Sequence, residues 1–218
     1  MPGYFITVEG IEGAGKTTIV KRLTNLLQEM GHPCVSCREP GGTEAAELIR
    51  NLLLDASIPL YPETELLLME AARAQLMREI VLPSLEAGKI VLLDRHGDST
   101  LAYQGFGRGL EADSILWLNR FAANRRSPDL TLLLDVDVRM GLARTRKRNS
   151  PSAASDRFES ETIEFLERAR QGFLSMARNE PERFCVVSTN VGEEEMWAQT
   201  ERAVLDRLQN LGVVAKGL

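Results

Sequence analysis

Nine consecutive residues near the start of the chain have the types and spacing of a phosphate-binding loop. They are Gly10, Ile11, Glu12, Gly13, Ala14, Gly15, Lys16, Thr17 and Thr18, which read G-x-x-x-x-G-K-T-T. Glycines allow the tight turn in which consecutive backbone N–H groups surround a phosphate, and a following helix adds the partial positive charge of its N-terminus. The Lys16 ammonium can reach the β- and γ-phosphates of a nucleoside triphosphate, and the Thr17 hydroxyl can ligate Mg²⁺.

The neighbouring residues distinguish this loop from a glycine-rich turn that only connects two elements. An apolar, strand-like run, Phe5–Glu9, precedes the loop, and a helical pattern, Lys16–Met30, follows it. A connecting turn needs neither lysine nor threonine at its end, whereas phosphate binding uses both. The sequence therefore predicts a site for a nucleoside triphosphate.

Length and composition fit a single α/β domain spanning residues 1–218. Hydrophobic residues make up 44% and charged residues 26% of the chain, as in ordinary globular proteins. A net charge of -5 argues against binding to a nucleic-acid polymer, which depends on basic side chains. No apolar run reaches the length of a membrane span and no signal peptide is recognised, so we expect a cytoplasmic protein that does not bind membranes.

The three cysteines, Cys34, Cys37 and Cys185, suggest neither redox chemistry nor a metal site. A redox C-x-x-C pair lies at a helix N-terminus, but Cys34 and Cys37 fall in a strand-like run, where residues three apart point to opposite faces. A metal site would need further ligands, and only Cys185 and two histidines remain. We expect all three thiols to be reduced and structural.

Strand-like runs alternate with helical patterns along the whole chain. The predicted strands are Phe5–Glu9, Cys34–Arg38, Ile90–Asp94, Leu130–Asp135 and Phe184–Ser188. The predicted helices are Lys16–Met30, Thr43–Leu54, Glu63–Ala87, Glu111–Asn124, Val138–Lys147, Glu161–Asn179 and Glu193–Leu211. Gly31, Gly88 and Gly212 follow helical patterns, as helix-terminating glycines do. This order predicts a five-stranded parallel sheet flanked by helices, the fold of a P-loop NTPase.

Ligands of an open parallel sheet bind beyond the carboxyl ends of its strands. Glu9 and Asp94 end two predicted strands, and Arg95 follows directly. With Arg38, Arg50 and Arg73, this arginine could capture a second phosphate group through bidentate hydrogen bonds. The small, polar stretch Asn149 to Ser155 is expected to be a mobile surface loop.

Several longer motifs resemble those of bacterial thymidylate kinases, which are P-loop nucleoside monophosphate kinases. They are Arg38-Glu39-Pro40-Gly41-Gly42-Thr43, Ala71-Ala72-Arg73-Ala74-Gln75, Asp94-Arg95-His96, Ala102-Tyr103-Gln104-Gly105, Gly107-Arg108-Gly109, Pro128-Asp129-Leu130-Thr131-Leu132 and Asp156-Arg157-Phe158-Glu159. The resemblance extends from Phe5 to about Glu195. It implies transfer of the γ-phosphoryl group of Mg·ATP to dTMP, which gives dTDP and ADP. It also implies a homodimer, which the apolar residues of Glu111–Asn124 and Leu66–Ile80 would allow.

The resemblance also implies roles for individual residues. The catalytic residues would be Lys16, Arg95, Arg148, Arg157 and Glu9. ATP would be bound by the loop residues Gly10 to Thr18 and by Arg144. Mg²⁺ would be held by Thr17 and Asp94. The residues around dTMP would be Glu39, Pro40, Arg50, Met69, Arg73, Arg95, Ser99, Thr100, Tyr103 and Gln104. Within this set, Arg73 would reach the thymine edge and Tyr103 would pack on the deoxyribose, although a tyrosine there could also be an ordinary core residue.

Residues 144–157 resemble the short, mobile lid of the family. The segment Arg144-Thr145-Arg146-Lys147-Arg148 could supply the cation that stabilises the transferring phosphoryl group, because the loop itself carries Glu12 and Gly13 there. A run of charge on a helix can also be only a solvated face. At Met69, many relatives have an aromatic residue that stacks on thymine. A methionine can cover a base, but with less defined geometry.

Two other classes of function fit parts of the sequence. A deoxynucleoside kinase, or a kinase of another monophosphate, could be built on the same scaffold. A nucleotide-dependent switch or partition protein would also have a phosphate-binding loop. The guanine-reading motif N-K-x-D of GTPases does not occur in the chain. Phosphate transfer to an added acceptor would separate a kinase from a switch.

Overall fold

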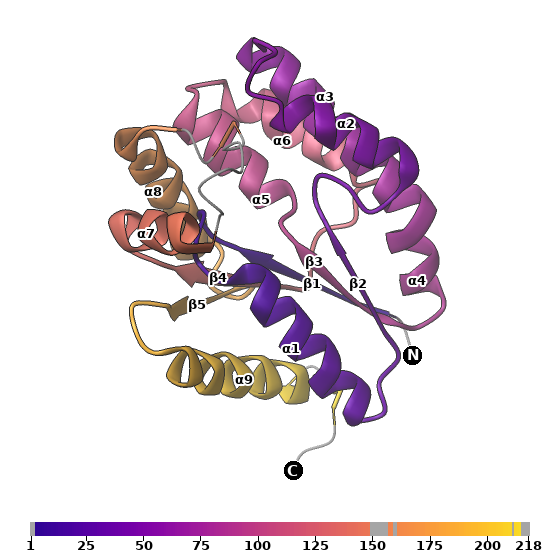
Figure 1. The fold of residues 1–218 in the computed structure, drawn as a ribbon. Coiled ribbons are helices and arrows are strands. Elements are labelled where there is room, and N and C mark those ends of the chain that lie inside the picture. The colour runs from indigo at the N-terminus through magenta and orange to yellow at the C-terminus, as the bar shows by residue number, and fades with distance from the viewer. Residues whose placement is uncertain (1–2, 149–156, 159–160, 211, 215–218) are drawn as a thin grey trace.

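The computed structural model describes residues 3–148, 157–158, 161–210 and 212–214, with only the backbone at Arg148. In this part of the chain one parallel sheet has five strands in the order β2-β3-β1-β4-β5 (Figure 1). The strands are β1 (Tyr4–Glu9), β2 (Cys34–Arg38), β3 (Ile90–Asp94), β4 (Leu130–Asp135) and β5 (Phe184–Ser188). The predicted sheet is confirmed, and each strand agrees with its prediction within one residue.

Helices connect the strands in the predicted alternation. They are α1 (Lys16–Glu29), α2 (Glu44–Leu54), α3 (Pro62–Leu76), α4 (Leu82–Glu86), α5 (Gly97–Thr100), α6 (Ala112–Ala122), α7 (Val138–Arg148), α8 (Ile163–Asn179) and α9 (Glu193–Asn210), with the π-helical segments η1 (Met77–Val81) and η2 (Leu101–Gly107). Among these helices we find none whose length and apolar character would let it cross a membrane.

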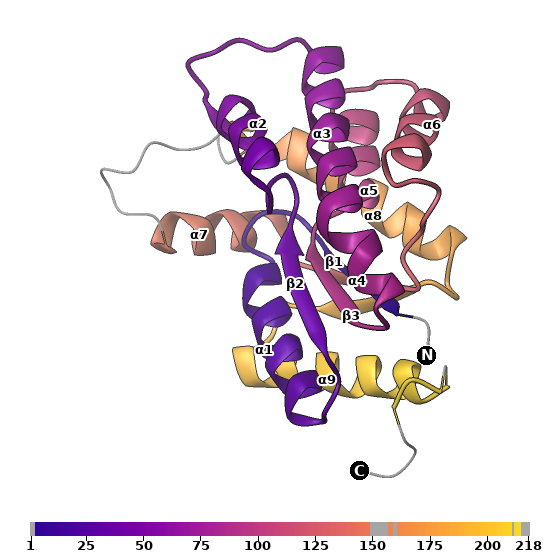
Figure 2. The same cartoon turned by 90° about the vertical axis from the view of Figure 1, so that its right-hand side faces the viewer.

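Helices cover both faces of the sheet. α1 contacts β1, β2 and β3 and lies beside α9 on one face, whereas α4 and α8 contact strands on the other face (Figures 1 and 2). Because successive side chains of a strand point to opposite faces, Ile6 and Val8 pack into the apolar cluster that contains α1. Phe5 packs into a separate cluster with Leu76 and Met77. Burial on both faces explains why the strands read as nearly continuous apolar runs.

The cysteines occupy the positions expected from this alternation. Cys34 packs against the larger apolar cluster, which contains α1, and Cys37 packs against the separate cluster of Phe5; all three cysteines are free thiols. Burial raises the pKa of Cys34 to about 11 and also raises that of Cys37. The prediction of unbonded, structural cysteines agrees with this geometry.

The helical segments differ from the prediction in two places. The predicted helix Glu63–Ala87 is helical from Pro62 to Glu86, but it contains the π-helical segment η1. Pro83 has no N–H to donate to the carbonyl four residues earlier, and the π segment ends just before it. The second difference is the helical stretch α5–η2, which was not predicted because its glycines at 97, 105 and 107 weaken the helical pattern.

Candidate functional site

The loop between β1 and α1 folds closely against its surroundings because glycine occupies three of its positions. Gly10 has φ 138°, and a Cβ there would lie 2.4 Å from the carbonyl oxygen of Leu134. Gly13 has φ 72°, and a Cβ there would lie 2.1 Å from the carbonyl oxygen of Gly141. Gly15, with φ 96°, precedes α1 and offers no side chain to cap it. The first N–H groups of α1 therefore remain available to an anion.

The Lys16 side chain lies inside this loop. Its Nζ donates to the carbonyl oxygens of Gly10, at 2.9 Å, and Ile11, at 2.8 Å. Burial, and then the positive charge of Arg95, lower the pKa of Lys16 to about 8. The ammonium is thus held inside the loop by two backbone carbonyl groups.

A cavity of about 650 Å³ extends from this loop over the carboxyl ends of β2 and β3. Most of the predicted site residues line it: Glu12, Gly13, Lys16, Thr17, Glu39, Pro40, Arg50, Met69, Arg73, Asp94, Arg95, Ser99, Thr100, Tyr103 and Gln104. It also includes Arg38, one of the arginines expected at this edge, and residues for which no role was predicted, among them Cys37, His96 and Phe158. One cavity therefore joins the loop to the arginines predicted for the second substrate.

Arg95 joins the loop to η2. Its backbone has φ 72°, a conformation uncommon for residues other than glycine. Its guanidinium donates to the Gly10 carbonyl at 3.0 Å, to the Ser99 hydroxyl at 3.1 Å and to the Glu12 carboxylate at 2.7 Å. The Tyr103 hydroxyl donates to the other oxygen of Glu12 at 2.7 Å. Glu12 thus holds Arg95 and Tyr103 together at the wall of the cavity.

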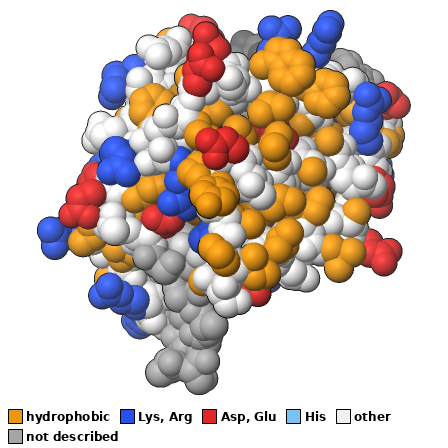
Figure 3. Space-filling model, turned by 90° about the horizontal axis from the view of Figure 1, so that it is seen from above, with side chains coloured by type: hydrophobic (Ala, Val, Ile, Leu, Met, Phe, Trp, Pro, Cys, Tyr) orange, Lys and Arg blue, Asp and Glu red, His pale blue; other side chains and the backbone are white. Residues whose placement is uncertain are grey.

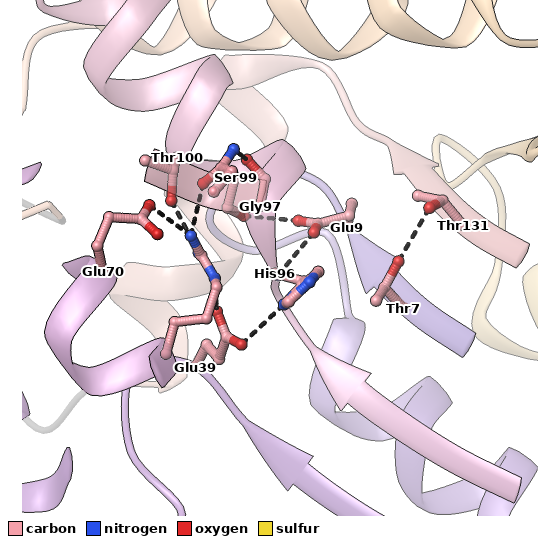
Figure 4. Close-up of polar contacts among 11 residues, drawn as sticks. Thr7, Glu9, Glu39, Glu70, His96, Gly97, Ser99, Thr100 and Thr131 are labelled. Atoms are coloured by element: carbon pink, nitrogen blue, oxygen red, sulfur yellow. Dashed lines mark hydrogen bonds and ion pairs between the residues drawn. The ribbon is translucent and has the colours of Figure 1, made fainter. Parts of the chain in front are cut away.

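Arg73 is buried among acidic and polar side chains. Its guanidinium donates to Glu39 at 2.8 Å, Glu70 at 2.5 Å, Asn119 at 2.6 Å and Thr100 at 2.8 Å. Figure 4 shows Glu39, Glu70 and Thr100 converging on this group. Burial is the largest single effect and raises the pKa of Glu39. The charges and hydrogen bonds of Arg73 and His96 together outweigh it, so the net shift of this pKa is downward.

Glu9 lies at the end of β1, behind the cavity wall. Its carboxylate accepts from the backbone N–H of His96 at 2.7 Å and from the Ser99 hydroxyl at 2.6 Å (Figure 4). Burial, followed by the negative charge of Asp98, raises the pKa of Glu9 to about 8. Glu9 is fully buried and does not line the cavity, whereas Ser99, which donates to it, does.

Thr17 and Asp94 face each other at the start of α1 and the end of β3. The Thr17 hydroxyl donates to the Asp94 carboxylate at 2.6 Å. Within the described ranges, no group of three or more His, Cys, Asp or Glu side chains could hold a metal ion. A cation at this pair would therefore take its other ligands from a bound nucleotide or from water.

The same architecture and sequence recur in known proteins. The thymidylate kinase family model matches residues 8–199. A thymidylate kinase of Geobacter sulfurreducens is 52% identical over 95% of this chain and 97% of its own length, and one of Deinococcus radiodurans is 44% identical over 94% and 98%. The crystal structure of thymidylate kinase from Ehrlichia chaffeensis aligns with TM-score 0.75 and 34% identity over 97% of this chain and all of its own.

This chain belongs to the thymidylate kinase family. The resemblance noted in the sequence is thereby confirmed, and so is the fold expected from it. The roles of the individual residues stay predictions, because the family match does not test them.

The predicted lid of this family member is described only at its two ends, since residues 149–156 lie outside the described part of the chain. On one side, the Arg144 guanidinium donates to the backbone carbonyl of Thr189 at 2.8 Å. On the other, the Arg157 guanidinium donates to the carbonyls of Leu53 at 2.9 Å and Asp55 at 2.7 Å. Arg157 therefore contacts the C-terminal end of α2, and neither arginine lines the cavity. The Arg148 side chain is not described.

Some residues that shape this thymidylate kinase site were missed in the sequence. Glu70 and Asn119 bind Arg73, and His96 Nδ1 lies 2.8 Å from a Glu39 oxygen. Glu70 could have been recognised as an i,i+3 partner of Arg73 on a helix. Asn119 and His96 gave no such signal, because they meet their partners only through the tertiary fold.

Proposed function

We propose that this chain transfers the γ-phosphoryl group of ATP to dTMP and releases dTDP and ADP. The observation that carries the proposal is the single cavity in which the Lys16 loop, Arg95 and the buried Arg73 all take part. ATP would bind at the loop with its phosphates against Lys16 and the N-terminus of α1. The acceptor would lie on the Arg95 and Arg73 side. Membership of the thymidylate kinase family supports dTMP as that acceptor.

No covalent intermediate with the enzyme is needed for this reaction. An oxygen of the dTMP phosphate attacks the γ-phosphorus of ATP in line, a P–O bond to the ADP oxygen breaks, and the new bond gives dTDP. Lys16 holds the ATP phosphates and Arg95 holds the acceptor phosphate, so the protein supplies position and positive charge. We propose that Arg148 or Arg157 of the lid adds a further cation at the transferring group.

The chemistry of the Thr17–Asp94 pair fits Mg²⁺. A hydroxyl and a carboxylate are hard oxygen ligands, and Mg²⁺ is commonly held by one or two such side chains together with substrate phosphates. Thr17 and Asp94 would hold the ion beside the loop. When bound, Mg²⁺ neutralises the charge that develops between the β- and γ-phosphates.

We also propose that the enzyme is a homodimer. The side of the molecule formed by α2, α3 and α6 carries exposed apolar residues, including Leu67, Trp117 and Phe121. Figure 3 shows hydrophobic side chains gathered over this side. Apolar patches of this kind mark protein–protein contacts. A cytoplasmic location stays a prediction.

An acceptor screen tests the proposed function. The purified protein is given Mg·ATP with dTMP, dUMP, dCMP, dGMP or thymidine, and ADP release is followed with a coupled assay. We expect the highest kcat/KM with dTMP. The Lys16→Met variant, purified in the same way, should lose this activity by several orders of magnitude and still bind dTMP, which excludes a contaminating kinase.

The same screen distinguishes the rival functions. Preference for thymidine would identify a nucleoside kinase, and preference for a different monophosphate would identify another member of the scaffold class. Met69 lines the cavity and is the observation that favours testing other bases. A thioether fixes the position of a base less well than an aromatic ring does. Tight ATP binding without transfer to any acceptor would indicate a switch or partition protein.

A further inference from the structure

Gln104, on η2, forms a hydrogen bond with a buried carboxylate. Its side chain lines the cavity but is only 1% exposed, and its Nε2 donates to Glu65 Oε1 at 2.8 Å. Among the described residues, no donor contacts the other amide atom, Oε1. The two polar atoms of this amide therefore have different surroundings, and Nε2 is the one that contacts Glu65.

Glu65 is itself fixed in place. It is 2% exposed, and Arg108 donates to both of its oxygens, at 3.2 Å from Nε and 3.1 Å from Nη2. Arg108 also pairs with Glu161 at 2.5 Å, and its guanidinium lies over the Phe165 ring, 4.6 Å from the centroid. A carboxylate paired with arginine can only accept hydrogen bonds. The amide end that faces Glu65 must therefore be the NH₂ group.

We infer that Glu65 is a positioning residue for base selection, because it fixes the Gln104 amide with its carbonyl oxygen toward the cavity. An acceptor at this position favours a base whose ring nitrogen carries a hydrogen, as thymine N3 does. It disfavours cytosine, whose N3 has a lone pair and would face the carbonyl oxygen. The inference rests on the proposed function, since it assigns the base-reading polarity of that same site.

Arg73 completes the pattern on the same cavity wall. A guanidinium has five N–H groups, and four hydrogen bonds of Arg73 go to Glu39, Glu70, Asn119 and Thr100. Among the described residues, one N–H on Nη2 has no acceptor, so it can donate to a ligand. A donor from Arg73 and an acceptor from Gln104 match the O4 acceptor and N3–H donor of thymine. Cytosine presents an amino group and a bare nitrogen instead, the reverse order.

The variant that tests this role is Glu65→Gln. An amide at position 65 can either donate or accept, so the Gln104 amide is free to turn and present its NH₂ group to the base. We expect the ratio of kcat/KM for dTMP to that for dCMP to fall by at least about tenfold, mainly through KM. A glutamate that only stabilises the packing of α3 against η2 would lower both activities and leave the ratio unchanged.

Two controls separate positioning from stability. Glu161→Gln removes the other carboxylate of Arg108 but leaves Gln104 and Glu65 in contact, so the ratio should stay that of the wild type. In a Gln104→Leu background, Glu65→Gln should change the ratio no further, because Glu65 acts through Gln104. If Glu65→Gln does not fold, Glu65→Asp keeps the charge and shortens the reach to Gln104, with the same expected loss of selectivity.

The outcomes can be assigned without ambiguity. An unchanged ratio in a folded Glu65 variant overturns the inference, and so does a further fall in the Gln104→Leu background. If the wild-type protein does not phosphorylate dTMP at all, the proposed function fails instead. Wild-type selectivity for dTMP with loss of selectivity in the Glu65 variant, but not in the Glu161 variant, supports the inference.

Discussion

Two cations lie beside the same loop: Lys16, which is buried, and Arg95, which is partly buried. Their mutual repulsion and their burial destabilise the charged forms of both side chains. The pKa of the lysine is lowered, because a guanidinium holds its proton more firmly than an ammonium does. The pKa of Lys16 is accordingly lowered to about 8, while that of Arg95 is raised above its usual value in spite of burial, with Tyr103 and Glu12 among the groups responsible. Nucleotide phosphates next to Lys16 would favour its charged form.

This balance predicts a pH dependence of ATP binding. In the free protein, Lys16 loses its proton as the pH rises through about 8, so binding above that pH must be accompanied by proton uptake. We expect the Kd for ATP to be nearly constant well below pH 8, to have begun rising at about pH 8, and to approach a rise of about tenfold per pH unit above it. Isothermal titration calorimetry between pH 7 and 9.5 measures this. Lys16→Arg, which does not titrate there, should show no such rise, and a flat wild-type profile would refute the assignment.

Tyr103 predicts selectivity for a deoxyribose acceptor. Its ring lies against Phe158, and the guanidinium carbon of Arg95 lies 5.0 Å from the ring centroid. We propose that this ring packs on the sugar of the acceptor, where it would leave no space for a 2′-hydroxyl. Tyr103→Ala should lower the activity on dTMP. It should also reduce the preference in kcat/KM for dTMP over ribo-TMP, which we expect to correspond to about 1–3 kcal/mol in the wild type. The ratio of kcat/KM for the two acceptors measures this. Tyr103→Phe keeps the ring and should keep the ratio. If the ratio falls in this variant, the tyrosine hydroxyl and not the ring is responsible for the selectivity.

Which residues could be predicted depends on how local their signals are. The phosphate-binding loop is contiguous, so its glycines, Lys16 and Thr17 could be predicted directly from spacing. The partners of Arg73 could not all be predicted, since Glu39 and Asn119 lie 34 and 46 residues away along the chain. The fold alone decides that they meet. Glu65 was missed for the same reason, because its contact with Gln104 spans 39 residues.

At the level of elements, η2 is the segment that brings Tyr103 and Gln104 to the cavity. Its position depends on close packing against α8. A Cβ at Gly107 would lie 2.6 Å from the Phe165 ring, and one at Gly172 would lie 2.7 Å from Phe106. Each helix thus carries a glycine opposite an aromatic ring of the other, and this pairing sets their separation.

The packing predicts the effect of one methyl group. Gly107→Ala should destabilise the protein by about 1–3 kcal/mol, because the buried Phe165 has little room to move. It should also raise the KM for dTMP more than that for ATP, since η2 contributes to the side of the cavity where we propose that the acceptor binds. Chemical denaturation and steady-state kinetics measure the two effects. Gly192→Ala, where a Cβ would meet nothing within 4 Å, is the matched control, and equal behaviour of the two variants would contradict the packing argument.

The same glycines explain why the secondary structure was predicted only in part. Periodic apolar patterns identified every strand and the longer helices. The α5–η2 stretch was not predicted as helical because Gly97, Gly105 and Gly107 are poor helix formers. Here tertiary packing against α8 overrides their low helix propensity. η1 could not be predicted either, since a π segment adds one residue to a turn without a distinctive composition.

At the scale of the whole molecule, the side formed by α2, α3 and α6 has too much exposed apolar surface for an ordinary solvated face. Trp117 and Phe121 are 64% and 72% exposed, and their rings stack on each other with centroids 5.6 Å apart. Leu48 and Leu67 are also more than half exposed on neighbouring helices. Exposed aromatic pairs of this kind commonly anchor protein interfaces.

This surface predicts that one charge will separate the proposed dimer. Trp117→Glu places a carboxylate in the centre of an apolar contact, where it would be buried without a partner, so dissociation should become favourable. We expect light scattering after size exclusion to give twice the mass of one chain for the wild type and a single chain for the variant. Circular dichroism should show both proteins folded, because Trp117 contributes little to the core of its own chain. Met140→Glu introduces the same charge at a partly exposed apolar residue of α7 and should stay dimeric. A wild type that runs as a single chain, or a dimeric Trp117→Glu variant, would show that this surface does not hold two copies together.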